Sequence, residues 1–264
     1  MLLREVEYAK PGSVAEALEL LASNDGARAL AGGQTLINVM KARAASPDML
    51  VDLNGLEELR GIELAGDGTL TIGSMTTYTE LMGSAEAKAR PILGEVCATI
   101  ADVQVRNRGT IGGNVCSNDP TNHLPPLMVA VGARMTIAGA DGEREVTAEE
   151  FFLGVYLTAA GPGELLTRIS IPAGKKDGFA AVTLGVDGTC IANAAASVNG
   201  AVRVAIGCVD AVPVLVTADS PEGVADAVRG ANLMPPSDVH ASSEYRTHLA
   251  EVLATRAAEE AAGR

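Results

Sequence analysis

The sequence has no tryptophan, few aromatic residues and only four cysteines, and these shortages restrict the chemistry open to the chain. The cysteines are Cys97, Cys116, Cys190 and Cys208, and no two of them form a CxxC pair. Zinc and iron–sulfur sites are usually built from several thiolates at short, regular spacing. The histidines form no HExxH pair. We therefore expect no metal site in this chain and four free thiols in a reducing cytoplasm.

Basic residues and long apolar runs are also scarce. The 264 residues include 20 Lys and Arg against 33 Asp and Glu, which gives a formal net charge of −13. A nucleic-acid surface needs clustered positive charge, so nucleic acid is not an expected partner. No apolar run approaches the roughly 20 residues of a membrane-spanning helix. The charged N-terminal residues do not resemble a signal peptide, and we expect a cytoplasmic protein.

The familiar motifs of a self-contained catalytic site are missing as well. There is no GxSxG nucleophile elbow, no Walker loop and no GxGxxG fingerprint. The residues therefore predict no catalytic group in this chain. Glycine, in contrast, is abundant, with 29 residues.

The pattern of apolar residues predicts an α+β fold in two parts. The first 55 residues predict a small lobe of alternating strands and helices, and residues 56–173 predict a second lobe with hairpins. Gly174–Gly178 contains two glycines and two lysines and is the best candidate for a domain boundary. We therefore divide the chain into residues 1–173 and 174–264.

The second part predicts a small sheet with helices. Three strands are expected there, at Phe179–Val186, Ala194–Val198 and Val202–Val209. A long terminal helix is expected over Ser243–Ala262, because its apolar residues recur at helical spacing.

Two pairs of adjacent glycines stand out from the other glycines. The first lies in Ala31-Gly32-Gly33-Gln34-Thr35-Leu36, between a predicted strand and a predicted helix. The second lies in Thr110-Ile111-Gly112-Gly113-Asn114, shortly before another predicted helix. Adjacent glycines allow backbone N–H groups to converge on an anion, and a following helix adds a favourable dipole.

The side chains beside these glycines are suited to the same ligand. Gln34, Thr35, Thr110 and Asn114 offer hydrogen bonds to phosphate or sugar oxygens. Two interpretations stay open from the residues alone: ordinary turns, or a nucleotide or dinucleotide held between two lobes.

At these motifs the sequence resembles a known family. AGGQTLINVMK (31–41) and RGTIGGNVCSNDPTNHLPP (108–126) are similar to the FAD-binding medium subunits of the molybdenum hydroxylases, which include carbon monoxide dehydrogenase and xanthine dehydrogenase. Further matching segments are PGSVAEALELLA (11–22), PGELLTRISIP (162–172) and SSEYRTHLAEVLATRA (242–257). The resemblance covers essentially the whole chain.

The resemblance implies a two-lobed FAD-binding domain of the PCMH type, followed by a small C-terminal α+β domain. The first motif, Ala31 to Leu36, would wrap the FAD diphosphate, and Thr110 to Asn114 would contact the diphosphate and the flavin. Relatives have an Asp where this chain has His123. Either His123 makes that contact, or nearby Asp119 or Asn122 replaces it.

Three further positions are carried over from the family. Leu166 and Asn193 fall where relatives have residues near the isoalloxazine. Relatives often have an acidic residue where this chain has Cys190.

The family also implies a function that explains the missing catalytic motifs. In it, a large molybdopterin subunit oxidises the substrate, a small subunit with two 2Fe–2S clusters transfers the electrons, and FAD on the medium subunit receives them. We expect this chain to be that FAD subunit, in a dimer of heterotrimers that passes electrons to an external acceptor. The alternatives are a self-contained FAD-dependent reductase of the same fold and a non-catalytic nucleotide-binding module.

Overall fold

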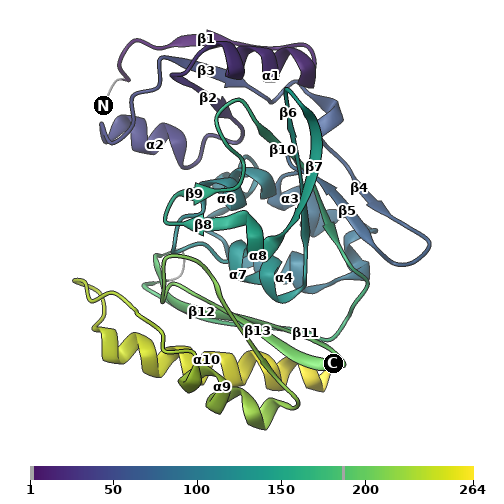
Figure 1. The fold of residues 1–264 in the computed structure, drawn as a ribbon, viewed down its shortest axis with the longest axis vertical. Helices are drawn as coiled ribbons and strands as arrows, with labels where there is room; N and C mark the ends of the chain where they lie inside the picture. The colour runs from purple at the N-terminus through teal and green to yellow at the C-terminus, as the bar shows by residue number, and fades with distance from the viewer. Residues whose placement is uncertain (1–2, 186–187) are drawn as a thin grey trace.

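Three larger sheets follow one another along the molecule, and a fourth sheet is a short two-stranded one, as the computed structural model shows for residues 3–185 and 188–264 (Figure 1). The N-terminal lobe lies at one end, a five-stranded sheet lies in the middle, and a four-stranded sheet with two helices lies at the other end. This mixture of helices and strands confirms the predicted α+β class.

The N-terminal lobe is a small parallel sheet with two helices. Its strands lie in the order β1 (Glu7–Ala9), β3 (Met49–Asp52) and β2 (Ala27–Leu30), and its helices are α1 (Val14–Ser23) and α2 (Leu36–Lys41). Ser13 caps α1 by accepting a hydrogen bond from the backbone N–H of Glu16. Parallel strands need crossover connections, which the two helices provide.

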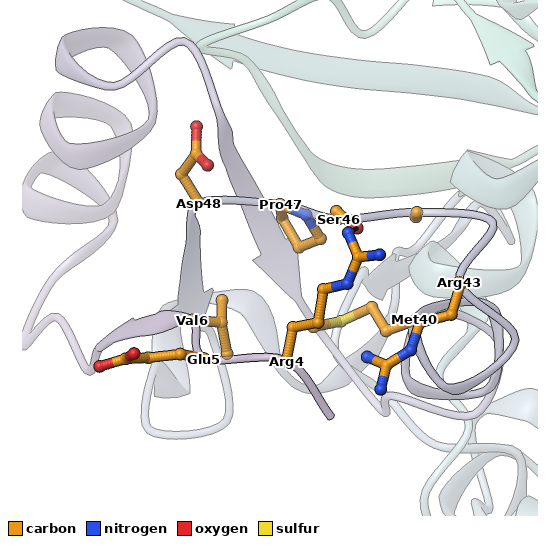
Figure 2. Close-up of a pocket in the computed structure, with 9 residues that line it drawn as sticks. Arg4, Glu5, Val6, Met40, Arg43, Ser46, Pro47 and Asp48 are labelled. Carbon is orange, nitrogen blue, oxygen red and sulfur yellow. Dashed lines mark hydrogen bonds between the residues drawn. The ribbon is translucent and has the colours of Figure 1, made fainter. Parts of the chain in front are cut away.

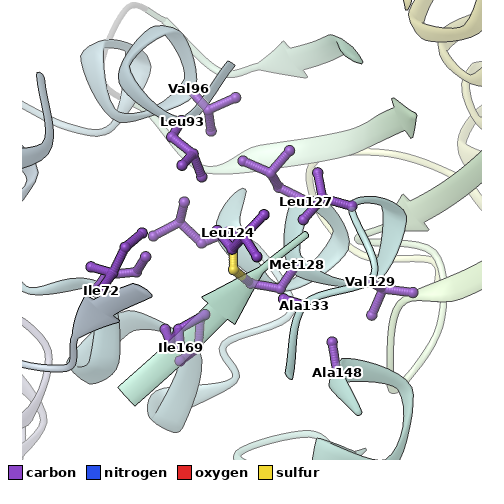
Figure 3. Packing of buried hydrophobic residues seen from close by; sticks show 14 of the residues in the cluster. Ile72, Leu93, Val96, Leu124, Leu127, Met128, Val129, Ala133, Ala148 and Ile169 are labelled. Atoms are coloured by element: carbon purple, nitrogen blue, oxygen red, sulfur yellow. The ribbon is translucent and has the colours of Figure 1, made fainter. Parts of the chain in front are cut away.

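The middle sheet is antiparallel and packs against a group of helices. Its strands lie in the order β4 (Ile62–Leu64), β5 (Leu70–Gly73), β10 (Leu165–Ile171), β6 (Arg134–Gly139) and β7 (Gly142–Thr147). The helices of this part are α3 (Tyr78–Gly83), α4 (Ile92–Thr99), α6 (Ile111–Ser117) and α7 (Leu124–Ala130). Their shared core includes Ile72, Leu93, Leu124, Leu127 and Ile169, all almost fully buried (Figure 3).

The C-terminal sheet has four strands where the sequence predicts three. They are β11 (Asp177–Thr183), β12 (Cys190–Asn199), β13 (Ala201–Gly207) and β14 (Val214–Ala218), all antiparallel. The additional strand is β14, a short edge strand directly after Pro213 whose residues do not alternate between apolar and polar. Val186, the predicted end of the first strand, lies outside the described residues.

Helices cover both faces of this sheet. α9 (Val224–Gly230) and α10 (Ser243–Gly263) pack on one face, and α7 contacts β12 and β13 from the middle part (Figure 1). The buried face of α10 carries small residues, among them Ala250, Ala254 and Ala257, so the helix lies close to the strands. Among the described residues, no helix is both long enough and apolar enough to cross a membrane.

The remaining elements are short. They are η1 (Glu57–Leu59), η2 (Ala87–Ala89), α5 (Val103–Arg106), α8 (Ala148–Phe151), β8 (Phe152–Gly154), β9 (Leu157–Thr158) and η3 (Pro221–Gly223).

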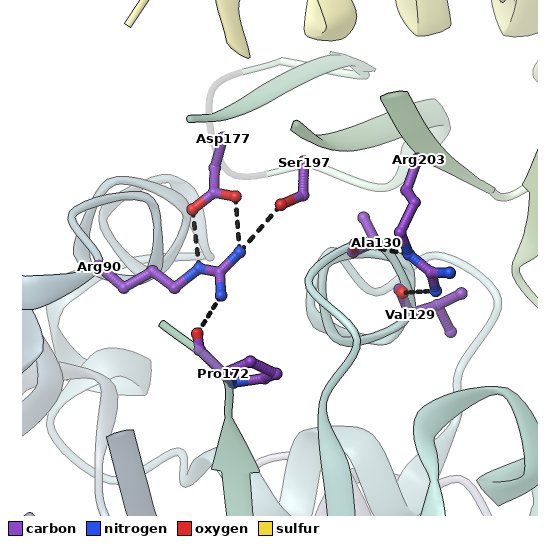
Figure 4. Close-up of polar contacts among 7 residues, drawn as sticks. All are labelled: Arg90, Val129, Ala130, Pro172, Asp177, Ser197 and Arg203. Atoms are coloured by element: carbon purple, nitrogen blue, oxygen red, sulfur yellow. Dashed lines mark hydrogen bonds and ion pairs between the residues drawn. The ribbon is translucent and has the colours of Figure 1, made fainter. Parts of the chain in front are cut away.

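A buried ion pair fastens the C-terminal sheet to the middle part (Figure 4). Arg90, just before α4, donates to both carboxylate oxygens of Asp177 at 2.8 Å, to Ser197 Oγ at 3.0 Å and to the carbonyl of Pro172. Arg203 on β13 adds a second link, because it donates to the carbonyl of Val129 at the end of α7. The predicted boundary after residue 173 falls between β10 and β11, and the division into separate domains stays a prediction.

Candidate functional site

The first glycine pair lies in the connection from β2 to α2. Gly33 has a φ of +74°, a conformation that side chains with a Cβ rarely adopt. Gly32 lies against the second motif: a Cβ on Gly32 would lie 2.1 Å from the carbonyl oxygen of Arg108. Only glycine at position 32 lets the two motifs come this close.

The second glycine pair lies inside a helix rather than in a loop before one. Thr110 is the N-cap of α6, and its hydroxyl accepts a hydrogen bond from the N–H of Gly113 at 3.1 Å. A Cβ on Gly112 would lie 2.5 Å from the carbonyl oxygen of Ser74, so α6 packs tightly against the end of β5. The pair therefore serves close packing of a helix.

The two motifs offer different numbers of free N–H groups. In the second motif, the N–H groups of Ile111, Gly112, Gly113 and Asn114 all donate within the chain, so they do not form the open anion nest that the sequence suggested. In the first motif, no described residue accepts from the N–H groups of residues 32–35. The donors available to an anion therefore come from the first motif, and the second motif supports it.

Side chains fix the shape of the first motif. Gln34 Nε2 donates to the carbonyl of Gly32 at 3.2 Å, and Asn54 Nδ2 donates to the carbonyl of Ala31 at 2.9 Å. Thr35 is exposed and its hydroxyl makes no capping bond to α2, which leaves it available to a ligand. Leu36, the first residue of α2, is half-buried.

A chain of hydrogen bonds leads from the second motif to the C-terminal sheet. Asn122 Nδ2 donates to the carbonyl of Asn114 at 3.2 Å, and Asn193 Nδ2 donates to the carbonyl of Asn122 at 3.2 Å. Asn193 Nδ2 also lies 3.1 Å from His123 Nδ1, and because the amide nitrogen only donates, His123 Nδ1 is the acceptor. The structure thus brings His123 and Asn193 into contact, and the family resemblance had put both residues at the FAD site.

Asp119 stands in the same loop but is occupied by its neighbours. Its Oδ1 accepts from the N–H and the hydroxyl of Thr121 at 2.9 and 2.8 Å, and its Oδ2 accepts from Tyr156 Oη at 3.2 Å. Asp119 therefore shapes the loop that holds His123.

Leu166 does not join this group of polar residues. It is 4% exposed, pairs with Ile137 across β10 and β6, and belongs to the core of the middle part. The family resemblance puts Leu166 near the isoalloxazine, but its side chain is buried in the core rather than open to a ligand. Its contact with the flavin stays a prediction.

Sequence reasoning missed Tyr78, which supports the second motif from behind. Its ring lies so close to Gly109 that a Cβ there would be 2.7 Å from Tyr78 Cε2. Burial raises the pKa of Tyr78 well above its usual value, so the phenol is neutral at physiological pH. The only sequence signal was the capping box of Thr77 and Glu80, which predicts the helix but not this contact.

A cavity of about 210 Å³ lies elsewhere in the N-terminal lobe (Figure 2). It is lined by Arg4, Glu5, Met40, Arg43, Ser46 and other residues near the end of α2. None of the predicted site residues lines it.

The hydrogen-bond donors and acceptors around the two glycine motifs, residues 31–36 and 110–114, fit FAD. The free N–H groups of the first motif are suited to a diphosphate. Two buried amide oxygens, Asn114 Oδ1 and Asn193 Oδ1, have no hydrogen-bond donor among the described residues. Buried acceptors are normally satisfied, so their lack of a donor is consistent with a ligand that supplies N–H or O–H groups. FAD carries both on its ring and its ribityl chain.

Comparison with known proteins also points to an FAD-binding chain. The model of the FAD binding domain in molybdopterin dehydrogenase matches residues 4–174. The carbon monoxide dehydrogenase medium chain of Afipia carboxidovorans is 38% identical, with 100% of this chain and 99% of that protein covered. The glyceraldehyde dehydrogenase medium chain of Sulfolobus acidocaldarius is 33% identical, with 98% and 99% covered.

Solved structures agree in fold over the full length. Quinoline 2-oxidoreductase from Pseudomonas putida 86 matches with a TM-score of 0.92 and 32% identity, covering 100% of this chain and 99% of that one. A Cu,Mo-CO dehydrogenase matches with a TM-score of 0.89 and 35% identity, also covering 100% and 99%. These findings confirm the resemblance found in the sequence: the chain belongs to the family of FAD-binding subunits of molybdopterin dehydrogenases.

Proposed function

We propose that this chain is the FAD-carrying electron-transfer subunit of a molybdenum hydroxylase complex. In this proposal it accepts electrons from a partner with two 2Fe–2S clusters, and it passes them to an external acceptor. A large molybdopterin subunit oxidises the substrate, three different chains form a heterotrimer, and two heterotrimers form a dimer in the cytoplasm.

The observation that carries the proposal is the junction of the two glycine motifs. The N–H groups of residues 32–35 would bind the diphosphate, and Thr35 would add its hydroxyl. Asn114 and Asn193 would each accept a hydrogen bond from FAD, and His123 would hold Asn193 in place. FAD, when bound, supplies the ability to take up and release one or two electrons. The chain itself binds and orients it.

The alternatives differ from this proposal in what the purified chain would contain. A self-contained reductase of the same fold would reduce a substrate without partner subunits. A non-catalytic nucleotide-binding module would contain no flavin. The relatives named above are medium chains of dehydrogenases, which favours the subunit role.

Replacing Gly33 tests the flavin site. Gly33→Asp puts a Cβ where φ is +74° and a negative charge beside the predicted diphosphate. We expect flavin, measured as visible absorbance per polypeptide, to fall at least about tenfold, the equivalent of 1.4 kcal/mol. The control is Gly200→Asp, which has the same charge and a similar φ of +82° but lies in the turn between β12 and β13.

The two variants separate loss of the site from loss of the fold. Gly200→Asp should retain flavin, and both variants should keep the circular dichroism of the wild type. Full flavin content in Gly33→Asp, or a wild-type chain that never contains flavin, would contradict the proposal.

Affinity purification from the native host tests the partners. The tagged chain should recover one large subunit with molybdopterin and one small iron–sulfur subunit, and light scattering should give the mass of two heterotrimers. Substrate reduction by the flavin-containing chain alone would support the self-contained reductase instead.

A further inference from the structure

Two cysteines far apart in the sequence meet beside His123. Cys190 is the first residue of β12, and Cys208 directly follows β13, where it has a φ of +67°. Asn193 Nδ2 lies 3.4 Å from Cys190 Sγ and 3.5 Å from Cys208 Sγ. The same nitrogen lies 3.1 Å from His123 Nδ1, so two thiols, an amide and an imidazole share one small space.

The surroundings make these two thiols unequal. A hydrogen bond from Cys208 is the largest cause that lowers the pKa of Cys190 below its usual value, and His123 and Asn193 lower it further against the effect of burial. The pKa of Cys208 is raised, because it donates to Cys190 and is buried. Of the two thiols, Cys190 is therefore the one that loses its proton more readily, and Cys208 is the one that keeps it.

The other two cysteines lack this arrangement. Burial alone raises the pKa of Cys97 and that of Cys116 to about 12, so both stay protonated and unreactive at neutral pH.

Metal binding is a poorer explanation for the cluster. Over residues 3–185 and 188–264, no group of three or more His, Cys, Asp or Glu side chains has an arrangement that could hold a metal ion. Two neighbouring thiols, one of which ionises more readily than the other, are suited to thiol–disulfide chemistry instead.

We propose that Cys190 and Cys208 are a redox-active dithiol that a peroxide converts to an intramolecular disulfide. The Cys190 thiolate attacks one oxygen of hydrogen peroxide, the O–O bond breaks, and the departing hydroxide takes up a proton to form water. The sulfur becomes a sulfenic acid. Cys208 then loses its proton and attacks that sulfur, the S–O bond breaks, and a second water leaves. One peroxide is reduced and two thiols are oxidised.

Both thiols are almost covered, because Cys190 is 2% exposed and Cys208 is 6% exposed. Cys208 lines a small cavity of about 10 Å³ together with Asn122, Pro126, Gly207 and Asp210. This volume is at the lower limit for a single water, so peroxide and thiol reagents reach the pair when the segment around Cys208 opens locally. The dithiol lies beside His123 and Asn193, and its oxidation by peroxide requires no bound flavin.

Mass spectrometry of the full-length chain tests the proposal. The chain is reduced, freed of reductant, treated with stoichiometric hydrogen peroxide while folded, blocked with N-ethylmaleimide and digested. We expect a peptide that joins Cys190 to Cys208, formed by peroxide and lost on treatment with dithiothreitol. In Cys208→Ser, the sulfenic acid on Cys190 should persist and react with dimedone.

The matched control is Cys97→Ser, which changes a buried cysteine outside the cluster and should leave the cross-link unchanged. If Cys208→Ser does not fold, a measurement on the wild-type chain still tests the proposal. Its Cys190 should react with iodoacetamide at pH 7 at least about tenfold faster than Cys97. Equal rates, or a cross-link that forms only after unfolding in denaturant, would overturn the proposal.

Discussion

At the scale of single residues, the glycine pairs act through the side chains that they lack. Gly32 allows the carbonyl of Arg108 to approach, and Gly112 allows that of Ser74 to approach. These two contacts join segments that are separated by many residues in the sequence. The local conformation of a turn would explain neither of them, because neither Gly32 nor Gly112 has a positive φ.

Replacing Gly32 by alanine should separate the two motifs. Gly32→Ala adds a Cβ 2.1 Å from the Arg108 carbonyl oxygen, and since both sides are backbone, one of them must move. We expect a loss of about 1–3 kcal/mol in the free energy of unfolding, measured with urea, and a lower flavin content. Gly66→Ala is the control, because nothing lies within 4 Å of its added Cβ. Equal stability of the two variants would contradict this role.

The residues of the site could be predicted only in part from the sequence. The first motif could be identified because its glycines stand between a strand and a helix. The contribution of Asn122 could not be assigned, because its bonds to Asn114 and Asn193 depend on how α6, α7 and β12 pack. The contact between Cys190 and Cys208 also depends on strand pairing, so spacing in the sequence gives no sign of it.

At the scale of elements, α6 shows where local propensity misleads. Its sequence contains two adjacent glycines, which are poor helix formers, so the pattern predicts a loop. The structure forms a helix because Thr110 caps it and because Val115 and Ile111 are fully buried. Tertiary packing therefore stabilises the helical conformation of α6, which its amino-acid composition alone does not favour.

The start of α10 should respond to acid. Asp238 accepts from the N–H groups of His240 and Ala241 and pairs with Arg246, and these contacts lower its pKa from 3.8 to about 2. Its stabilising effect is present above pH 3.8 and is lost as the pH falls toward about 2. In urea unfolding across this range, Asp238→Asn should lose less stability than the wild type.

An exposed aspartate provides the control for this pH dependence. Asp219→Asn, just after β14, should follow the wild-type curve across the same pH range. If Asp238→Asn and the wild type lose stability in parallel, Asp238 does not anchor the start of α10.

At the scale of the whole molecule, the sequence predicts the order of the helices and strands better than the contacts that hold the sheets together. The β/α lobe, the hairpins of the middle sheet and the long terminal helix follow from periodicity and turn residues. The fourth strand of the last sheet was missed, because an edge strand needs only one neighbour and β14 is short. The ion pair of Arg90 and Asp177 was also missed, because the neighbouring residues in the sequence give no sign that these two charged side chains are buried.

This ion pair should dominate the attachment of the C-terminal sheet. The Asp177 side chain is 1% exposed, so Arg90→Met leaves a carboxylate buried without its partner. We expect a loss of about 3–5 kcal/mol in the free energy of unfolding and faster proteolysis between β10 and β11. The double variant Arg90→Met, Asp177→Leu should recover much of that loss, because the buried charge is removed together with its partner.

A second ion pair between the same two parts provides the matched control. Arg264 at the end of α10 pairs with Glu95 of α4, but their side chains are 28% and 48% exposed. Water screens such a pair, so Arg264→Met should cost at most about 1 kcal/mol. If both single variants lose the same stability, burial of the Arg90 pair is not what holds the sheet. If the double variant is no more stable than Arg90→Met, the cost comes from lost packing rather than from the unpaired carboxylate.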